Sequence, residues 1–591
     1  METCELEHRY LNGYKIAKTL ITAYADFYNN HVYVWRGQTN EEEKCPIGDL
    51  SSFFDGLFIR FKNKYFPGNK KKRIRLLVFI NDLKSLRAGV LSYVKGIEIG
   101  EKKRPNSDEG PMYFITDSVI YANFNVIANN SPEFYLEMLG SPSCEVAMYD
   151  AIKMISGGDW TKSAWSLAYI TKKMFYSGLE HLCEYMKTDR ELNGYFPNVH
   201  SDMFVGNKSG ALRKFDGNNE LTRIILRDVD SYDKKSAYPS VLVNDKMFPI
   251  GAIKKLKVKK WDVIKTICEY LIRGDAWIKI VISGSFYTSS QEINSLFYDN
   301  DSGKYALEIY DIMLANEIKV LSTLFNDIES SDCKVDIYVS EQTGYLDKSF
   351  RSKIVKLYEE KNSIKDKHSP RRFLLKTQLD MLNGKSIQHK TYSAMKYLCI
   401  DMCPHDKDGK IFNQLGSASH YLRPQHGMHA IAAVRYEIIS SIMTAKRTGC
   451  SVIAWDTDGI KLIDNHKKTN YIGDTVSPTF INVLNSDIER KNAEAGFPEC
   501  DIGTWDHEYT ADRFMQIGTK QYVYQTGDNV HYKSAGLERC CIEDAVQSLG
   551  LSKPEDVFIY LRANKLICKR RFLAYYDVER IYYYEYQDVE F

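Results

Sequence analysis

The chain is 591 residues long, which at about 100–200 residues per domain suggests about three or four domains. It carries 79 lysines and arginines against 77 aspartates and glutamates, a formal net charge of +2 that excludes a histone-like or polycationic protein. A hydrophobic fraction of 44% excludes wholesale disorder, and the 13 scattered cysteines suit a reducing compartment. The first residues lack the apolar core of a secretory signal, and no apolar run is long enough to span a bilayer. We therefore expect a soluble, cytoplasmic protein without a membrane partner.

The first 200 residues alternate between strand and helix patterns. Residues 75–81 (RLLVFIN) predict a buried strand, residues 83–94 a helix, and residues 163–186 a long amphipathic helix. A polar, turn-rich stretch follows over residues 193–219. We therefore expect a domain boundary near residue 200.

Beyond this boundary, strands and helices are predicted around several carboxylates and lysines. The patterns predict a strand over 221–227, helices over 316–326, 348–383 and 430–447, and a β-hairpin over 451–463. The helical pattern over 348–383 is interrupted at Ser369 and Pro370.

Two aspartates stand at the tip of the predicted hairpin. Asp456 and Asp458 are two residues apart, so on an extended chain their side chains face the same way. Like charges side by side cost free energy unless a cation bridges them, and Mg²⁺ is held by a few carboxylates together with substrate phosphates. Taken alone, the pair also fits an aspartate-rich turn without function.

A third carboxylate, Asp233, stands at the end of a predicted strand. Residues 233–240 (DKKSAYPS) predict a tight turn that leads into a helix-favouring stretch. Backbone N–H groups of such a turn can face an anion. The alternative is an ordinary connection between a strand and a helix.

Lysines recur on two further predicted elements. Lys361 and Lys376 are fifteen residues apart, about four turns of one helix, with two arginines between them. Lys520 and Tyr522 would share one face of a strand. Each pattern alone also fits a solvated surface.

In order and spacing, these segments resemble the family B DNA polymerases of the protein-primed, phage phi29-like type. Residues 233–239 (DKKSAYP) are similar to polymerase motif A (DxxSLYP), with Ala237 at the usual leucine. Residues 456–459 (DTDG) are similar to the DTDS of motif C, with Gly459 at the serine and Trp455 near the motif's tyrosine.

Two further segments extend the resemblance along the chain. Lys520-Gln521-Tyr522 resembles the KxY motif, and residues 533–536 (KSAG) resemble the segment that follows it. Residues 204–207 (FVGN) look like a variant of the YxGG connector between exonuclease and polymerase domains.

Motif B (KxxxNSxYG) gives the weakest match. Lys376 and Gly384 have its spacing. Asp380, Met381 and Asn383 replace its asparagine, serine and tyrosine.

The resemblance implies a role for each of these residues. Phosphoryl transfer assisted by two Mg²⁺ (or Mn²⁺) ions needs carboxylates that converge from separate strands. The implied catalytic metal ligands are Asp233 and Asp458, with Asp456 as a weaker ligand. The implied nucleotide-binding residues are Ser236, Tyr238, Lys361 and Lys376. The implied DNA- or primer-binding residues are Thr457, Lys520 and Tyr522.

The first domain of this family is an RNase H-like 3′–5′ exonuclease built on four carboxylates, and here it looks degenerate. The nearest first motif begins at Asp26 and has Tyr28 in place of a glutamate, whereas the second, over residues 82–86, has Leu86 in place of an aspartate. The third motif keeps Asp150. Because the remaining pair would hold two metal ions poorly, we expect an inactive exonuclease-like domain.

The expected fold is multidomain, of α/β and α+β type, with an RNase H-like exonuclease-type domain followed by a right-hand polymerase of palm, fingers and thumb. The degenerate exonuclease-like domain is expected at 1–200, and palm and fingers at 201–510, with insertions at about 251–348 and 386–421. The end of the palm and a short thumb are expected at 511–591. In protein-primed relatives, an insertion contacts the terminal protein.

The expected activity is DNA-directed DNA polymerisation that replicates a viral or plasmid genome, adding a nucleotide to a 3′-hydroxyl or protein primer without proofreading. The expected partners are DNA template and primer, dNTPs and a terminal priming protein, with the chain as a monomer. One alternative is a polymerase-like enzyme that performs untemplated or defence-related synthesis. Another is a catalytically inactive DNA-binding scaffold. Lys376 and Tyr238 argue against a phosphatase or nuclease.

Overall fold

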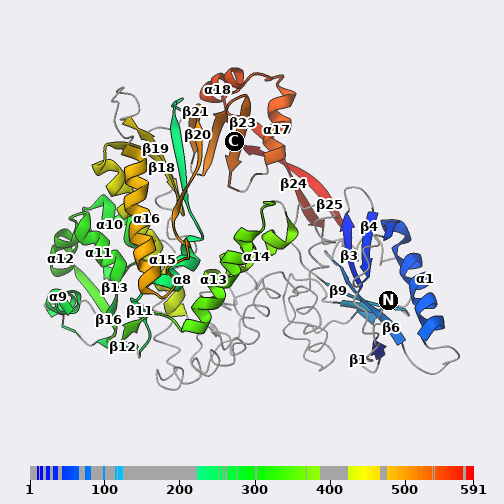
Figure 1. Cartoon of the computed structure of the whole chain (residues 1–591), viewed down its shortest axis with the longest axis horizontal. Helices are drawn as coiled ribbons and strands as arrows, with labels where there is room; N and C mark the ends of the chain where they lie inside the picture. Colours follow the sequence, from blue (N-terminus) through cyan, green and yellow to red (C-terminus); the bar gives the residue numbers. More distant parts are fainter. Residues whose placement is uncertain are drawn as a thin grey trace.

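The computed structural model of the chain places its sheets and helices in an arch (Figure 1). The described residues are 9–11, 14–16, 21–26, 31–36, 43–65, 74–80, 98–99, 113–115, 118–123, 223–251, 253–256, 258–259, 262–273, 276–299, 303–367, 369–386, 424–465, 476–518, 520–535, 537, 539–576 and 581–591. Several predictions lie outside these residues: the helices over 83–94 and 163–186, the boundary near 200, residues 204–207, the insertion over 386–421 apart from its first residue, and Tyr28, Leu86 and Asp150.

The N-terminal sheet has the order β5-β4-β3-β6-β9-β8-β7, with β1 and β2 attached through β6. Its strands are β1 Arg9–Leu11, β2 Tyr14–Ile16, β3 Ile21–Asp26, β4 His31–Arg36, β5 Glu43–Pro46, β6 Ile74–Ile80, β7 Glu98–Ile99, β8 Tyr113–Ile115 and β9 Val119–Asn123. β6 confirms the strand predicted over 75–81, and it runs parallel to both β3 and β9. The short 3₁₀ helix Ile47–Asp49 leads into helix α1 (Leu50–Tyr65), whose Phe54 packs in one core with Val78 and Ile80.

The four-stranded sheet that carries the predicted carboxylates has the order β18-β19-β10-β20. Its strands are β10 Val229–Lys234, β18 Cys450–Asp456, β19 Gly459–Asp464 and β20 Trp505–Ala511. The hairpin predicted over 451–463 is confirmed as β18 and β19. The strand predicted over 221–227 is wrong, because Arg223 (φ 62°) and Asp228 (φ 54°) lie in the left-handed region and interrupt an extended chain.

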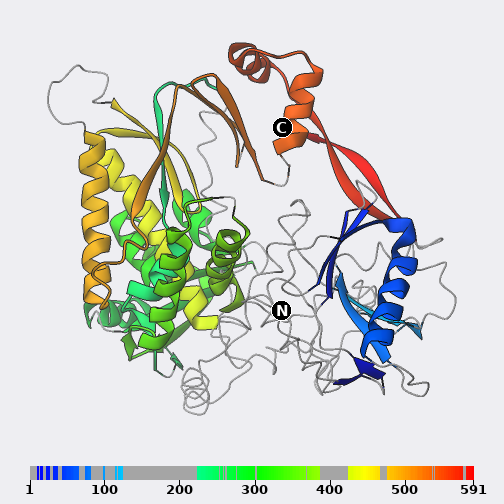
Figure 2. The same ribbon diagram turned by 45° about the vertical axis from the view of Figure 1, so that its right-hand side comes forward.

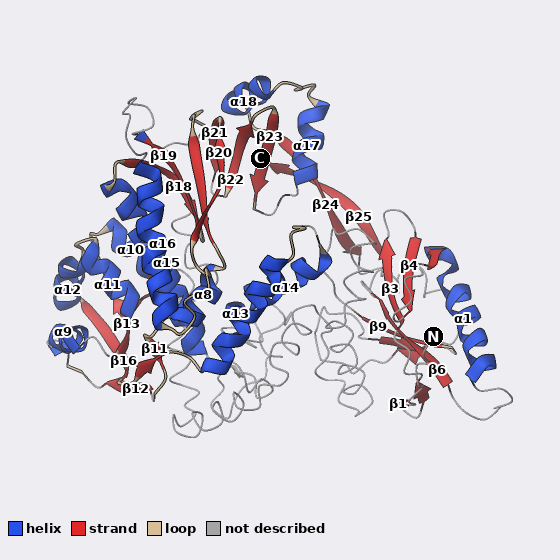
Figure 3. Cartoon of the chain, in the orientation of Figure 1, coloured by secondary structure: helices blue, strands red, loops and turns tan. Residues whose placement is uncertain are grey.

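The helices that share one core with this sheet are α8 Ala237–Asn244, α13 Lys348–Ser363, α14 Pro370–Ser386, α15 Pro424–Arg447 and α16 Val476–Glu494. Figure 3 shows α15 and α16 beside the sheet, whereas α13 and α14 extend away from it. Their apolar faces meet the sheet in one core, where Val241, Ile438 and Phe480 pack with Leu462. α15 confirms the helix predicted over 430–447, and the break at Pro370 divides 348–383 into α13 and α14.

A five-stranded unit lies beside these helices and has the strand order β12-β16-β13-β15-β14. It comprises β12 Ile253–Leu256, α9 Val263–Arg273, β13 Trp277–Ser285, α10 Gln291–Phe297, β14 Tyr298–Asp299, β15 Lys304–Glu308, α11 Ile309–Glu317, α12 Leu321–Ser330 and β16 Asp332–Ser340. β11 (Phe248–Pro249) and β17 (Thr343–Gly344) pair with each other where the chain enters and leaves this unit. The single helix predicted over 316–326 is wrong, since Lys319 (φ 61°) separates α11 from α12.

The C-terminal elements are β21 Arg513–Gly518, β22 Gln521–Thr526, β23 Asn529–Ser534, α17 Arg539–Ser548, α18 Pro554–Ala563, β24 Ile567–Tyr576 and β25 Ile581–Glu590. β21, β22 and β23 form a three-stranded sheet. The β24–β25 ribbon extends from these helices toward the N-terminal sheet in both Figure 1 and Figure 2. Among the described helices, none combines the length and apolarity that a membrane span requires.

Candidate active site

Strand β10 brings Asp233 to the hairpin tip that carries the other two aspartates. In the sheet register Asp233 lies opposite Gly459, and Gly459 in turn lies opposite Asp456. The backbone N–H of Lys234 donates a hydrogen bond to the carbonyl oxygen of Asp458 at 2.8 Å. The three aspartates predicted from sequence therefore lie together at one end of the four-stranded sheet.

The electrostatics of Asp233 and Asp458 show that these carboxylates are near each other and partly shielded from water. Burial raises the pKa of Asp233, and the Asp458 carboxylate raises it further. Burial likewise raises the pKa of Asp458, with Asp456 as the next cause. Gly459 leaves room beside them, because a Cβ at position 459 would lie 3.3 Å from Oδ1 of Asp233. The site holds close like charges that a cation would stabilise.

This donor set fits a hard divalent cation that is shared with substrate phosphates. Within the described ranges, no cluster of three or more histidine, cysteine, aspartate or glutamate side chains is arranged to hold a metal ion. Mg²⁺ is commonly bound by one or two carboxylates together with substrate phosphates, so Asp233 and Asp458 suffice for such a site. Their oxygen ligands suit Mg²⁺ or Mn²⁺.

Two charged residues beside the aspartates were missed by the sequence reasoning. Glu508 on β20 accepts a hydrogen bond from the Ser231 hydroxyl at 3.1 Å and contributes to the raised pKa of Asp233. The buried Lys461 on β19 lies 4.6 Å from the centroid of the Tyr522 ring, and burial lowers the pKa of its ammonium. The charged residues within 459–464 and 505–511 could have pointed to Lys461 and Glu508. The sequence does not show, however, which strands lie beside these two.

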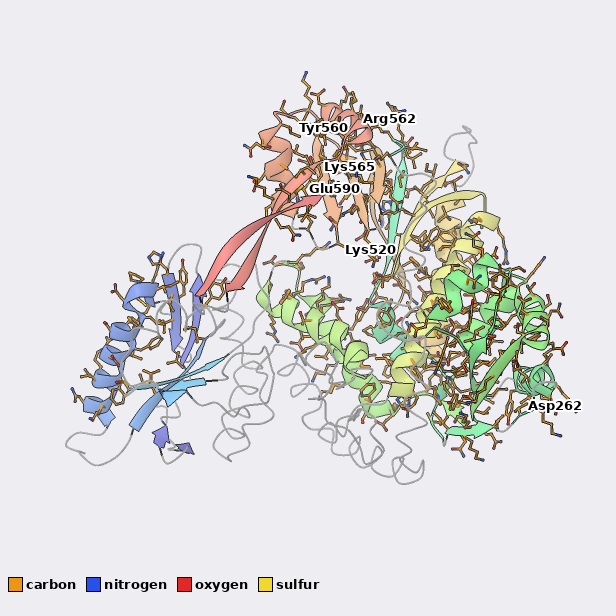
Figure 4. All side chains as sticks on the ribbon, turned by 180° about the vertical axis from the view of Figure 1, so that it is seen from behind. Asp262, Lys520, Tyr560, Arg562, Lys565 and Glu590 are labelled. Atoms are coloured by element: carbon orange, nitrogen blue, oxygen red, sulfur yellow. The ribbon has the colours of Figure 1, made fainter. Side chains whose placement is uncertain are left out.

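Lys520, which Figure 4 labels, contacts the hairpin tip directly. Its Nζ lies 2.8 Å from Oδ1 of Asp456 and 3.2 Å from Oγ1 of Thr457. The prediction that Lys520 lies on a strand is wrong, because it has φ 57° in the turn between β21 and β22. Tyr522 does lie on β22. The left-handed turn before β22, and not the alternation of side chains along a strand, directs Lys520 toward Asp456.

The turn after Asp233 holds the predicted nucleotide-binding residues Ser236 and Tyr238. Ser236 has φ 51° and is the N-cap of α8, and Tyr238 is partly buried against the core. Lys361 from α13 donates a hydrogen bond to the Ser236 hydroxyl at 3.1 Å. The Lys361 ammonium also lies 4.7 Å from the centroid of the Tyr358 ring.

Lys361 and Lys376 belong to different helices, so the prediction of one helix carrying both is wrong. α13 ends at Ser363 and α14 begins at Pro370, and the two helices pack as a hairpin. The lysines nevertheless lie in range of each other, since Lys376 helps to lower the pKa of Lys361, which burial brings to about 8. Asp380, one turn after Lys376, acts on both lysines and on Asp458. The hairpin of α13 and α14 therefore places two lysines and one carboxylate where they act on one another and, for Lys376 and Asp380, on Asp458.

Of the two predicted exonuclease remnants, only Asp26 lies within the described residues. It is the last residue of β3 and pairs with His31 on β4. Asp150 lies outside the described residues.

Comparison with solved structures finds DNA polymerases along the chain. A phi29 DNA polymerase complex with primer-template DNA and incoming nucleotides has a TM-score of 0.50 at 12% identity, covering 97% of this chain and 99% of that one. A second phi29 DNA polymerase complex, with primer-template DNA, has a TM-score of 0.49 at 11% identity, covering 99% of both chains. The family B DNA polymerase of Pyrobaculum calidifontis has a TM-score of 0.33 at 12% identity, covering 97% of this chain and 72% of that one.

No family model and no curated protein matches the sequence. The structural likeness alone shows that this chain has a mixed α/β polymerase fold. The particular fold is that of the phi29-like family B DNA polymerases, as the sequence motifs predicted.

Proposed function

We propose that the chain is a DNA-directed DNA polymerase. The observation that carries this proposal is the meeting of Asp233 and Asp458 at one end of the four-stranded sheet, with Lys361 reaching the adjacent turn. The fold shared with phi29 DNA polymerase, whose complex contains primer-template DNA and incoming nucleotides, supports it.

Different residues of the site would bind the metal ions, the nucleotide and the primer. Asp233 and Asp458, with Asp456 as a weaker ligand, would hold two Mg²⁺ or Mn²⁺ ions, which when bound supply activation of the 3′-hydroxyl and neutralisation of the leaving pyrophosphate. Lys361 and Lys376 bind the triphosphate as cations on the opposite side.

The sugar and the primer are contacted by the remaining residues. Tyr238 occupies the space beneath the sugar of the nucleotide, and Ser236 orients the turn that carries it. Thr457, Lys520 and Tyr522 hold the primer strand near the hairpin tip.

The finer proposal is a monomeric, protein-primed replicase of a viral or plasmid genome that lacks proofreading. Its division into an exonuclease-like domain at 1–200, palm and fingers at 201–510, and the end of the palm and thumb at 511–591 is part of this proposal. Covalent attachment of a labelled nucleotide to a co-purified protein, detected on a denaturing gel, would support protein priming. Release of nucleotides from single-stranded DNA in Mg²⁺ would contradict the absence of proofreading.

The test of polymerase activity is primer extension with and without a template, comparing Asp458→Asn with Asp262→Asn. Asp262 precedes α9 in the five-stranded unit. Figure 4 shows it far from Lys520, which contacts the hairpin tip, so Asp262→Asn controls for removal of a charge. Because a metal ligand supplies several kcal/mol of transition-state stabilisation, Asp458→Asn should reduce incorporation about a hundredfold or more.

Each outcome selects one function. Template-dependent extension that Asp458→Asn abolishes supports a replicative polymerase. Extension without template supports untemplated synthesis, and DNA binding without any incorporation supports an inactive scaffold.

A further inference from the structure

Helix α8 carries Tyr238, whose proposed position beneath the sugar would exclude a 2′-hydroxyl, and contacts hold the helix at both ends. At its start, Ser236 accepts the hydrogen bond from Lys361. At its end, Asn244 is followed by the partly buried Asp245. Since α8 is only eight residues long, a displacement at its end moves the whole helix.

The Asp245 carboxylate has three hydrogen-bonding partners. The Tyr310 hydroxyl donates a hydrogen bond to Oδ2 of Asp245 at 2.9 Å, and Nε2 of His429 lies 2.8 Å from the same oxygen. The other carboxylate oxygen, Oδ1, accepts the backbone N–H of Met247 at 2.8 Å. These contacts come from three segments: the end of α8, helix α15 and helix α11 of the five-stranded unit.

His429 joins α8 to the five-stranded unit. Its ring is fully buried, and Nδ1 lies 2.7 Å from Oε1 of Glu308, the N-cap residue of α11. In its imidazolium form the ring donates through both nitrogens, one to each carboxylate. Burial, the largest influence, would lower the pKa of His429, but Glu308 and Asp245 together raise it to about 10.

Further buried contacts fix α8 without involving the five-stranded unit. Nη1 of Arg351 donates to the carbonyl oxygen of Val243 at 3.3 Å, and Nδ2 of Asn244 donates to Oδ1 of Asn492 at 2.8 Å. Loss of one contact to Asp245 should therefore shift α8 slightly and leave it folded.

We propose that Tyr310 and His429 are positioning residues that hold α8, and with it Tyr238, so that the five-stranded unit takes part in nucleotide selection. This inference rests on the proposed polymerase function for its kinetic consequence. The positioning itself is a property of the fold and can be measured without activity. A purely structural role would lower stability and leave selection unchanged.

The experiment compares Tyr310→Phe with the matched control Tyr305→Phe in the full chain. Both changes remove one hydroxyl and keep the ring. Tyr305 lies in the same unit, but its hydroxyl bonds Asn294, away from α8. For each variant we would measure hydrogen exchange over residues 237–244, the KM and kcat for dNTP, the ratio of rNTP to dNTP incorporation, and the Tm.

Because the lost bond has a charged acceptor, Tyr310→Phe should raise the KM for dNTP by about fivefold to tenfold, with a smaller change in kcat. It should also raise the ratio of rNTP to dNTP incorporation and speed hydrogen exchange in α8. Tyr305→Phe should leave the KM, this ratio and the exchange unchanged. A second variant, His429→Gln, should likewise raise the KM for dNTP, raise the rNTP to dNTP ratio and speed hydrogen exchange in α8.

Failure of the proposed polymerase function and failure of the positioning inference would give different results. If the unmodified chain incorporates no nucleotide, the proposed function fails, and hydrogen exchange in α8 then decides the positioning claim. If the unmodified chain is active and Tyr310→Phe matches Tyr305→Phe in exchange, KM and sugar selection, the inference is overturned.

Discussion

Lys361 on α13 donates a hydrogen bond to the Ser236 hydroxyl, so a cation from one helix hairpin is fixed against the turn that follows Asp233. The Lys361 ammonium is partly buried, which lowers its pKa to about 8. Because burial disfavours the charged form of this lysine, the arrival of a polyanion beside it would stabilise the ammonium. Lys361 is therefore placed to respond to a triphosphate.

Lys361→Ala and Lys376→Ala should each raise the KM for dNTP more than the KM for primer-template DNA. One charged contact to a phosphate is worth about 1.5–3 kcal/mol, so roughly a tenfold to hundredfold effect is expected. Steady-state kinetics measure this, with the exposed Lys356→Ala on α13 as control. An effect confined to Lys361 would show that Lys376 does not fill the motif B lysine role.

Asp380→Asn should lower the KM for dNTP. The Asp380 carboxylate acts on Lys361, Lys376 and Asp458, and it would repel an incoming triphosphate. Asparagine keeps the shape and removes the charge, so we expect a decrease of about threefold or more. An unchanged or increased KM would mean that Asp380 binds the nucleotide and does not repel it.

Gly459→Ser restores the usual motif C residue but should reduce activity here. Its Cβ would lie 3.3 Å from Oδ1 of Asp233, which would force that carboxylate to move. Since small displacements of reacting groups are costly, kcat should fall roughly tenfold. Gly48→Ala, where a Cβ meets nothing within 4 Å, is the control. Full activity of Gly459→Ser would show that Asp233 adapts freely.

Tyr238→Val should relax the choice between deoxyribose and ribose. Tyr238 lies in the first turn of α8 and packs against the core, so its ring is restrained. We expect rNTP incorporation to rise about tenfold or more while dNTP use falls modestly. Equal loss of both activities together with a lower Tm would instead identify Tyr238 as a core residue.

His429→Gln should destabilise the protein most at low and neutral pH. A histidine whose folded pKa is raised contributes stability that is complete below its unfolded value of about 6.5 and is lost as pH rises through about 10. The Tm deficit of the variant should therefore shrink between pH 6.5 and pH 10. Tyr310→Phe provides the control with a constant deficit. A deficit of His429→Gln that is independent of pH would contradict an imidazolium between Glu308 and Asp245.

The sequence predicted local elements well where a strong periodic pattern was closed by a turn. The helix over 430–447 and the hairpin around Asp456 are confirmed, because hydrophobic periodicity and the Asp-Gly turn act over a few residues. Three other predictions were wrong because a residue has left-handed backbone: Arg223 in the strand predicted over 221–227, Lys319 between α11 and α12, and Lys520 before β22. None of these is glycine, so composition gave no warning.

The sequence did not predict which residues far apart along the chain become neighbours in the fold. Glu508 and Lys461 join the site only because β10 lies between β19 and β20, and a single sequence does not specify strand order. His429 stands on an apolar helix face, and nothing nearby in the sequence identifies Glu308 or Asp245 as its partners. The assigned roles of the site residues stay predictions until the variants are measured.

The central position of β10 has a consequence for the biosynthesis of the protein. Residues 230–233 pair with residues 459–462 on one edge, and residues 229–234 pair with residues 505–511 on the other. During synthesis, Asp233 leaves the ribosome long before either partner exists, so both edges of its strand stay open until the last quarter of the chain is being made. Such late, non-local pairing folds slowly and exposes strand edges to aggregation. We therefore expect that fragments ending before residue 459 bind chaperones and that the yield of folded protein depends on the rate of translation.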